Sequence, residues 1–231
     1  MSNNHVKERA VVLLSGGLDS TTCLAYAKSK NLDCYALSFN YGQKQISELE
    51  FAKKTAIKYG VIQHEIINLQ SIISFNSTAL VNKEISVPDY ENSDTIPSTY
   101  VPARNTIMLS LAIGLAEVID ANYIYIGASS IDYSGYPDCR PEYFDAFTKL
   151  ANLATKAGVE GKKLKIETPL LHLTKAETIL LGVSLGVDYT KTVSCYRANS
   201  EGLACGTCHS CYLRKKGFEE AELVDPTRYM V

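Results

Sequence analysis

The sequence predicts an α/β fold built on a doubly wound parallel sheet, and two observations carry this prediction. Apolar segments with strand character alternate with helical patterns: strands are expected at 10–14, 33–39 and 63–67, and helices at 22–28 and 46–59. Such alternation with short connections is typical of a parallel sheet covered by helices on both faces. In addition, a turn with two glycines joins the first strand to the first helix, at the sheet edge where ligands bind in such folds.

The later segments continue the same alternation. Strands are expected at 123–126 and 164–167, and helices at 69–80, 105–119, 141–154 and 175–185. Residues 82–102 contain three prolines and many small polar residues, and we expect them to be irregular, like 127–140. A connection as long as 82–102 inside a compact domain is usually functional or disordered.

Length and composition indicate how many domains the chain can form and which kinds of partner it is suited to. With 231 residues, of which 46% are apolar, the chain can form one large domain with a small appendage. We place the α/β domain at 1–190 and a C-terminal segment at 191–231. The net charge of −2 argues against direct nucleic-acid binding, which usually needs a basic excess. A polar N-terminus and the lack of a membrane-length apolar run favour a cytoplasmic protein without a membrane partner.

The hexad Ser15-Gly16-Gly17-Leu18-Asp19-Ser20 directly follows the first strand. Its glycines permit a tight turn and close approach of a ligand, and the helix N-terminus behind it favours an anion. The hexad lacks the Gly-Lys-Ser of a Walker loop, and it resembles the pyrophosphate loop of the ATP pyrophosphatases. We expect ATP binding here rather than a plain turn capped by Asp19 or Ser20. The expected ATP-binding residues are Leu14, Ser15, Gly16, Gly17, Leu18, Asp19, Ser20, Thr21, Thr22, Cys23 and Leu24.

Four of the seven cysteines crowd near the C-terminus: Cys195, Cys205, Cys208 and Cys211. Four thiolates suit a tetrahedral ion, and we expect one structural Zn²⁺ per chain because no coordination position is left open for chemistry. A redox dithiol, an iron–sulfur cluster and unconnected buried thiols are the alternatives. We expect His209 to be a solvent-facing spacer. The scattered Cys23, Cys34 and Cys139 are expected to be small core residues.

Residues 132–140 combine carboxylates, phenols and a guanidinium after a predicted strand. Tyr133 or Tyr136 could stack on a flat heterocycle, and Asp132 or Asp138 could accept hydrogen bonds from its N–H edge. Arg140 could hold a carboxylate with two hydrogen bonds. An ordinary surface loop explains the same composition equally well.

Isolated basic residues give weaker signals. Arg104, just before the predicted helix at 105–119, suits a phosphate or carboxylate contact, while Asn105 or Thr106 is expected to cap that helix. Lys44 follows the second strand beside the glycine turn, where it could neutralise phosphate charge or be solvated. The basic triplet 214–216 is expected to be a solvated helix face.

Taken together, these motifs resemble the 7-cyano-7-deazaguanine synthase family of the queuosine precursor pathway, in the PP-loop superfamily of ATP pyrophosphatases. The resemblance extends from Ala10 to Tyr229. It rests on the hexad, Tyr41-Gly42-Gln43, Val101-Pro102-Ala103-Arg104-Asn105, Asp132-Tyr133-Ser134-Gly135-Tyr136-Pro137-Asp138-Cys139-Arg140-Pro141, Glu167-Thr168-Pro169-Leu170, the four cysteines and Asp225-Pro226-Thr227. Gln45 and His209 depart from the family pattern, which has His and Asp there.

The resemblance implies an adenine nucleotide alpha hydrolase-like fold and an ATP-dependent ligase. Such an enzyme converts 7-carboxy-7-deazaguanine and ammonia to the nitrile through two adenylations, with Mg²⁺ at the phosphates, and works as a homodimer. The implied catalytic residues are Asp19, Ser20, Lys44 and Arg104. The implied substrate contacts are Tyr41, Asp132, Tyr133, Tyr136, Asp138 and Arg140.

Two alternative functions remain at this point. One is another PP-loop adenylating enzyme, such as a tRNA thiolase or an amidating synthetase. The other is a non-catalytic, zinc-bearing nucleotide-binding module that acts through partners.

Overall fold

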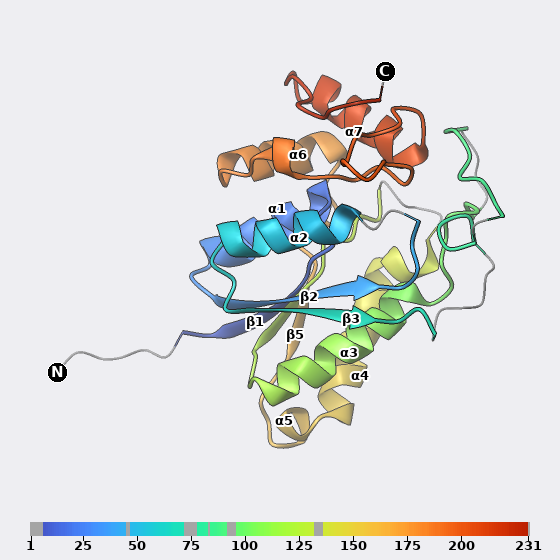
Figure 1. Ribbon diagram of the computed structural model, residues 1–231. Helices are drawn as coiled ribbons and strands as arrows, with labels where there is room; N and C mark the ends of the chain where they lie inside the picture. The colour runs from blue at the N-terminus through green and yellow to red at the C-terminus, as the bar shows by residue number, and fades with distance from the viewer. Residues whose placement is uncertain are drawn as a thin grey trace.

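The computed structural model describes residues 7–44, 47–71, 78–82, 84–91, 96–131 and 136–230. These residues form a five-stranded parallel sheet with the strand order β3-β2-β1-β4-β5 (Figure 1). The strands are β1 (Arg9–Leu13), β2 (Asp33–Asn40), β3 (Gln63–Asn68), β4 (Tyr123–Tyr125) and β5 (Lys165–Glu167). The doubly wound parallel sheet predicted from the sequence is therefore confirmed.

The central strand β1 is apolar throughout its buried part because helices cover both of its faces. Val11 pairs with Tyr35 on one side and with Ile124 on the other, and it is fully buried. Such a strand cannot alternate polar and apolar residues, which is why its run of apolar residues could be recognised in the sequence.

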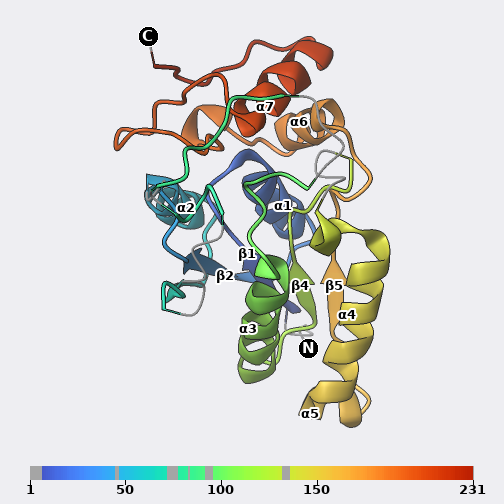
Figure 2. The same cartoon turned by 90° about the vertical axis from the view of Figure 1, so that its right-hand side faces the viewer.

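The helices lie in layers around the sheet (Figure 1). Helices α1 (Leu18–Ser29) and α2 (Ser47–Lys58) lie above it in that view, and α3 (Arg104–Val118) and α4 (Pro141–Ala154) lie below. The short α5 (Lys156–Val159) follows α4. Helices α6 (Lys175–Ser184) and α7 (His209–Glu220) form a further layer beyond α1 (Figure 2).

The α6–α7 layer packs closely on the rest of the molecule. A Cβ atom added at Gly217 of α7 would lie 2.4 Å from Cγ of Lys175 on α6, so the two helices approach too closely for a side chain there. Leu18 of α1, Ile179 of α6 and Phe218 of α7 share one buried apolar cluster. The C-terminal layer is thus connected to the helix that begins at the glycine turn.

The predicted element boundaries need few corrections. Helix α1 begins at Leu18, four residues earlier than the apolar pattern indicated, because the glycine turn is compact. The helix expected at 69–80 is wrong for 69–71 and 78–80, which are not helical; 72–77 lie outside the described residues. The described residues between 82 and 102 are irregular, as expected. None of the described helices combines the length and apolarity needed to cross a membrane.

Candidate functional site

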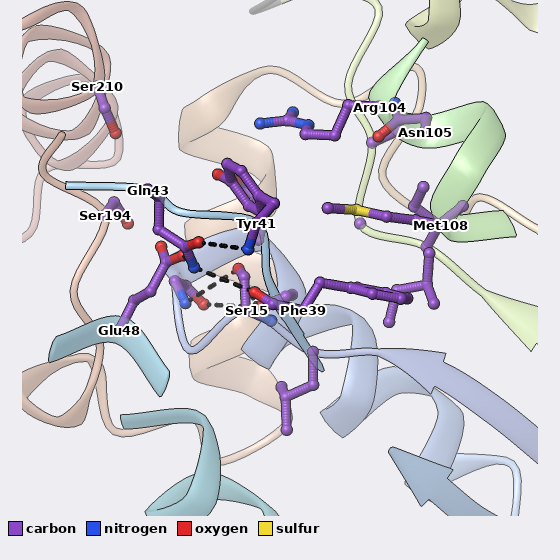
Figure 3. A pocket seen from close by; sticks show the side chains of 18 of the residues that line it. Ser15, Phe39, Tyr41, Gln43, Glu48, Arg104, Asn105, Met108, Ser194 and Ser210 are labelled. Atoms are coloured by element: carbon purple, nitrogen blue, oxygen red, sulfur yellow. Dashed lines mark hydrogen bonds between the residues drawn. The ribbon is translucent and has the colours of Figure 1, made fainter. Parts of the chain in front are cut away.

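A pocket opens at the point where the strand order reverses. From β1 the chain continues to β2 and β3 on one side of the sheet, and β4 and β5 lie on the other side of β1. The carboxyl ends of β1 and β4 therefore border a crevice. The crevice has a cavity volume of about 220 Å³. Its walls come from the glycine turn, the residues after β2 and β4, the start of α3, and Val193, Ser194 and Tyr196 (Figure 3).

Gly16 gives the turn after β1 its shape. Its φ of +83° lies in the left-handed region, and an added Cβ would lie 2.4 Å from the carbonyl oxygen of Glu48 and 2.7 Å from the nitrogen of Ala52. Both atoms belong to the backbone of α2 and cannot move aside easily. The sequence therefore needs glycine here, for its conformation and for the close approach of α2.

The hydroxyl groups of the hexad close the turn. The Oγ atoms of Ser15 and Ser20 are 3.0 Å apart, and the amide of Ser15 donates to Oγ of Ser20 over 3.2 Å. The amide of Leu18 donates to Oγ of Ser194, 3.1 Å away in the C-terminal segment. Helix α1 begins at Leu18 with Gly17 as its N-cap, so the capping role considered for Asp19 or Ser20 is wrong. Gly17 has no side chain to cap this N-terminus, and a helix N-terminus of this kind is suited to an anion.

Asp19 is fixed by a residue that we did not single out in the sequence. Nζ of Lys175 lies 2.6 Å from Oδ1 of Asp19, and the lysine side chain is only 8% exposed. Lys175 occupies the first turn of α6, where the helix macrodipole disfavours a cation. That unfavourable position is the signal in the sequence that could have identified it.

Arg104 enters the pocket from the first turn of α3. The helix follows Ala103, whose φ of 54° is left-handed, and Figure 3 shows the guanidinium extending above Tyr41. Burial by itself would lower the pKa of Arg104, but the groups that face it raise the pKa above its usual value. These groups are Tyr41, Tyr136, Tyr196 and Asp138. The pocket therefore contains a permanent cation opposite the glycine turn.

Asp138 caps α3 from a distant segment. Its Oδ2 accepts a hydrogen bond from the amide of Asn105 over 3.0 Å, and its carbonyl oxygen accepts one from Nδ2 of Asn105 over 2.9 Å. The expectation that Asn105 or Thr106 caps the helix is therefore wrong. Oγ1 of Thr106 lies 3.0 Å from the hydroxyl of Tyr143 instead. Asp138 is buried by this contact and is not among the residues that line the pocket.

The other expected substrate residues divide into three groups. Tyr41 and Tyr136 are buried in the pocket wall. Arg140 is exposed, lies outside the pocket lining, and its Nε donates to the carbonyl of Pro137 over 3.1 Å. Asp132 and Tyr133 lie outside the described residues.

Lys44 lies at the rim of the pocket, and its Nζ donates to the carbonyl of Ile85. It is exposed, so solvent and a protein carbonyl already satisfy its charge in this structure.

A second carboxyl group, Glu48, lines the same pocket from the first turn of α2. Its Oε1 accepts a hydrogen bond from Nε2 of Gln43 over 2.7 Å. Burial raises the pKa of Glu48 to about 7, although the hydrogen bond from Gln43 and the charge of Arg104 act in the opposite direction. Nothing in its local sequence distinguishes Glu48 from the other acidic residues of α2.

The four C-terminal cysteines come together as a compact cluster. All four Sγ atoms lie within 4.8 Å of one another, and the Cys205–Cys211 and Cys195–Cys208 pairs are each 3.9 Å apart. Metal–sulfur distances near 2.3 Å in a tetrahedral site place the sulfurs about 3.8 Å apart. Amides donate to these sulfurs, from Arg197 to Cys195 over 3.2 Å and from Cys208 to Cys205 over 3.4 Å. The cluster therefore fits one tetrahedral metal ion.

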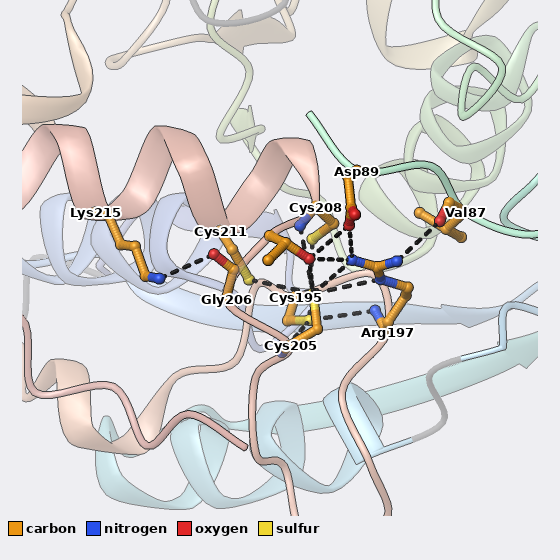
Figure 4. A network of polar contacts seen from close by, with 10 residues as sticks. Val87, Asp89, Cys195, Arg197, Cys205, Gly206, Cys208, Cys211 and Lys215 are labelled. Carbon is orange, nitrogen blue, oxygen red and sulfur yellow. Dashed lines mark hydrogen bonds and ion pairs between the residues drawn. The ribbon is translucent and has the colours of Figure 1, made fainter. Parts of the chain in front are cut away.

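Arg197 connects this cluster to residues 84–91 (Figure 4). Its guanidinium donates to Sγ of Cys205, to the carbonyl of Val87 over 3.2 Å and to Oδ1 of Asp89 over 2.5 Å. The amide of Tyr90 donates to the carbonyl of Thr207 over 2.9 Å. Residues 84–91 are therefore attached to the edge of the cysteine cluster.

Aromatic stacking strengthens the same contact. The ring of Tyr90 lies 3.8 Å from that of Tyr212 and 5.2 Å from that of His209, both nearly parallel. The expectation that His209 only faces solvent is wrong, because its ring belongs to this stack.

Comparison with solved structures identifies the fold. A 4-thiouridine synthetase in complex with RNA and bound ATP matches 93% of this chain and 50% of its own, with a TM-score of 0.52 and 17% identity. An NH3-dependent NAD synthetase from Campylobacter jejuni matches 81% of this chain and 68% of its own, with a TM-score of 0.50 and 21% identity. These similarities support the PP-loop fold expected from the hexad.

Sequence comparison identifies the family. The family model described as "Queuosine biosynthesis protein QueC" matches residues 9–222. A 7-cyano-7-deazaguanine synthase from Coxiella burnetii is 65% identical over 96% of this chain and 98% of its own length. One from Ruthia magnifica is 54% identical over the full length of both chains. Identity over this length decides against the thiolase, amidating synthetase and non-catalytic alternatives, and the chain belongs to the QueC family of 7-cyano-7-deazaguanine synthases.

Proposed function

We propose that this chain is an ATP-dependent ligase that converts 7-carboxy-7-deazaguanine and ammonia to 7-cyano-7-deazaguanine. A carboxylate is a poor electrophile, so it is adenylated first, and ammonia displaces AMP to give an amide. A second adenylation activates the amide oxygen, whose loss leaves the nitrile. The observation that carries the proposal is a single pocket that joins an anion-binding turn to Arg104 and two buried tyrosines.

The glycine turn is the proposed ATP site. The helix N-terminus at this turn favours phosphate. The pocket is lined there by Leu14, Ser15, Gly17, Leu18, Asp19 and Ser20, and residues 21–24 are buried behind them on α1. Mg²⁺ at the phosphates would offset their charge. Asp19 and Ser20 would position the turn, and Arg104 or Lys44 would stabilise the leaving pyrophosphate. The ion pair between Asp19 and Lys175 supports this role, because it fixes the carboxylate at the start of α1.

The deazaguanine ring is proposed to bind beside Tyr41 and Tyr136. Both rings line the pocket, and phenol faces stack on flat heterocycles. Asp132 or Asp138 remains the proposed contact to the ring edge, and Tyr133 remains the alternative to Tyr136 for stacking on the ring. The hydrogen bonds of Asp138 to Asn105 favour an indirect role in which it orients α3. The contact of Arg140 with Pro137 favours loop bracing over binding of the substrate carboxylate.

We further infer that the cysteine cluster binds one structural Zn²⁺, because four thiolates leave no open position. Free thiols and a zinc site fit a reducing, cytoplasmic setting. The division into an α/β domain at 1–190 and a zinc-binding segment at 191–231, and the homodimer, stay predictions.

The decisive test identifies the products. The purified protein is incubated with ATP, Mg²⁺, ammonium and 7-carboxy-7-deazaguanine, and mass spectrometry follows the small molecules. We expect the nitrile together with AMP and pyrophosphate. ATP binding without any product would retain the nucleotide site and reject the substrate.

A pair of variants tests the ATP site separately. Ser20→Ala removes a hydroxyl that closes the turn, and it should weaken ATP binding by about tenfold, measured by calorimetry. Ser29→Ala is the matched control, because Ser29 is exposed at the other end of α1. Equal affinity in the two variants would remove Ser20 from the proposed site.

A further inference from the structure

We propose that Glu48 is the general base for both nitrogen steps of the reaction. It would accept a proton from the attacking nitrogen when the amide forms, and the last N–H proton when the nitrile forms. This inference rests on the proposed function and deepens it, because it assigns one residue to two of the proton transfers that the reaction requires.

The position of Glu48 suits this role. Helix α2 starts directly behind the glycine turn, since the carbonyl oxygen of Glu48 itself blocks any side chain at Gly16. Glu48 lines the pocket together with Ser15 of the turn and Tyr41, and Figure 3 shows its side chain beside that of Gln43. ATP bound at the turn and a ring bound at Tyr41 would therefore meet beside this carboxyl group.

The orientation of Glu48 is set by Gln43. Oε1 of Gln43 accepts from the amide of Tyr41 over 2.9 Å, and its Nε2 donates to the carbonyl of Phe39 over 3.1 Å. These bonds fix which end of the amide faces Glu48, so Nε2 is the donor to Oε1 of Glu48. Within the described parts of the chain, Oε2 of Glu48 takes part in no hydrogen bond or ion pair. One carboxylate oxygen is anchored and the other is available to a ligand.

The remaining carboxyl groups near the pocket are less suited to accept a proton. Asp19 is paired with Lys175 at 2.6 Å, so its carboxylate already has a cationic partner. Asp138 is held by the two hydrogen bonds of Asn105 and lies outside the pocket lining. Among the described residues that line the pocket, Glu48 is thus the carboxyl group without a cationic partner.

The proton transfers balance in both steps. In the first step, ammonia adds to the acyl adenylate and a C–N bond forms. The Glu48 carboxylate takes a proton from that nitrogen, and the C–O bond breaks with its electron pair leaving on AMP. Adenylation of the amide oxygen then releases pyrophosphate, and the nitrogen gives one of its two N–H protons to water as the O-adenyl imidate forms. In the second step, the Glu48 carboxylate takes the remaining N–H proton, the third C–N bond forms, and the C–O bond breaks with its electron pair leaving on AMP. Glu48 releases its proton to water between the steps.

The ionisation of Glu48 suits a base that operates near neutral pH. Burial raises its pKa to about 7, and a proton acceptor works best when its pKa is near the working pH. Charged and titratable groups face it from every wall of the pocket: Tyr41 and Lys44 after β2, Arg104 on α3, Asp19 on α1, Tyr136 after β4 and Tyr196 in the C-terminal segment.

The test separates adenylation from proton transfer. Exchange of labelled pyrophosphate into ATP, with the acid substrate and without ammonium, reports adenylation alone. Glu48→Gln keeps the shape of the side chain and an acceptor for Gln43, so exchange should stay within about twofold of the parent. Amide and nitrile formation should fall by about 10²–10⁴-fold. Glu50→Gln is the matched control, because Glu50 lies on the same helix and pairs with Lys53 at the surface.

A second measurement removes ammonia from the experiment. With the preformed amide and ATP as substrates, only the nitrile step occurs. The assay then contains no ammonium, so the titration of ammonium cannot contribute to the pH profile. The rate for the parent protein should rise with pH through about 7, where Glu48 loses its proton, and this rise should be missing in Glu48→Gln. Glu48→Asp should retain the rise with a lower rate, because it keeps a carboxyl group on a shorter side chain.

Each failure has a distinct meaning. Equal product rates in Glu48→Gln and Glu50→Gln, or an unchanged pH profile, would overturn the role of Glu48 and leave the ligase intact. Loss of pyrophosphate exchange in Glu48→Gln would assign Glu48 to ATP activation instead of proton transfer. No exchange and no product in the parent protein would reject the proposed function itself.

Discussion

At Gly16, backbone conformation and close packing both exclude a side chain, and their effects can be measured separately. Gly16→Ala would force the turn away from α2, since the atoms in the way belong to the α2 backbone. We expect ATP affinity to fall by about tenfold or more, and stability by about 1–3 kcal/mol. Calorimetry and urea unfolding measure the two effects.

Gly161→Ala is the control for that prediction. Gly161 has a φ of +87°, close to that of Gly16, but nothing lies within 4 Å of an added Cβ. The control therefore has the conformational cost, about 1 kcal/mol, without the clash. If both variants bound ATP equally well, close packing against α2 would not be what shapes the site.

The ion pair between Asp19 and Lys175 gives a second prediction for single residues. Lys175→Met should leave the Asp19 carboxylate poorly compensated and destabilise the protein by about 2 kcal/mol, less than for a fully buried pair because Asp19 is 23% exposed. Lys162→Met is the matched control. Its pair with Asp120 has the same 2.6 Å separation but is exposed, so its loss should cost clearly less stability than the loss of Lys175. Urea unfolding of both variants decides whether burial makes the difference.

At the scale of elements, features that depend on nearby residues were predicted better than features that depend on contacts between distant residues. The strands, the glycine turn and the cysteine cluster depend on residues close together in the sequence, and all of them were found where expected. Lys175 and Asp19 are separated by 156 positions, and no periodicity connects them. Glu48 could not be distinguished in the sequence from the other acidic residues of α2, because its place in the pocket depends on the approach of α2 to the turn. The cap on α3 was misassigned because Asp138 reaches it from 33 residues away.

Helix α7 also contains a residue whose long-range contacts the local sequence did not indicate, and this residue leads to a prediction. The triplet 214–216 was expected to be solvated, but the side chain of Arg214 is only 3% exposed. It donates to Oγ1 of Thr192 over 2.9 Å, to the carbonyl of Tyr189 over 3.0 Å and to Oδ1 of Asp225 over 3.2 Å. Arg214→Met would remove all three of these donated hydrogen bonds and leave the Asp225 carboxylate, whose side chain is only 14% exposed, without its cationic partner, so we expect a loss of about 3 kcal/mol in urea unfolding.

The control for Arg214 lies two residues further along the same helix. Lys216 is exposed and forms only an i,i+4 pair with Glu220, at 3.6 Å. Lys216→Met should change stability by less than about 0.5 kcal/mol. A comparable loss in the two variants would mean that the buried contacts of Arg214 add nothing to the attachment of α7.

At the scale of the whole molecule, the C-terminal segment connects the metal cluster to the pocket. Val193, Ser194 and Tyr196 line the pocket on one side, and Cys195 of the cluster lies among them in the sequence. Ser194 also accepts a hydrogen bond from Leu18 at the start of α1. Residues 84–91 attach to the outer side of the cluster through Arg197 and Tyr90. Metal binding should therefore order one wall of the pocket and the 84–91 segment together.

Removal of one metal ligand tests this coupling. Cys205→Ala should lower the bound metal from about one ion per chain to well below stoichiometric, measured by elemental analysis. Hydrogen exchange should speed up at Tyr90, whose amide donates to Thr207, while the buried middle of α3 around Leu109 stays protected.

Cys34→Ala is the control, because Cys34 is buried in the core away from the cluster and should change neither the metal content nor exchange at Tyr90. Full metal content in Cys205→Ala would exclude that cysteine as a ligand. Metal loss with unchanged exchange at Tyr90 would mean that the 84–91 segment is held independently of the ion.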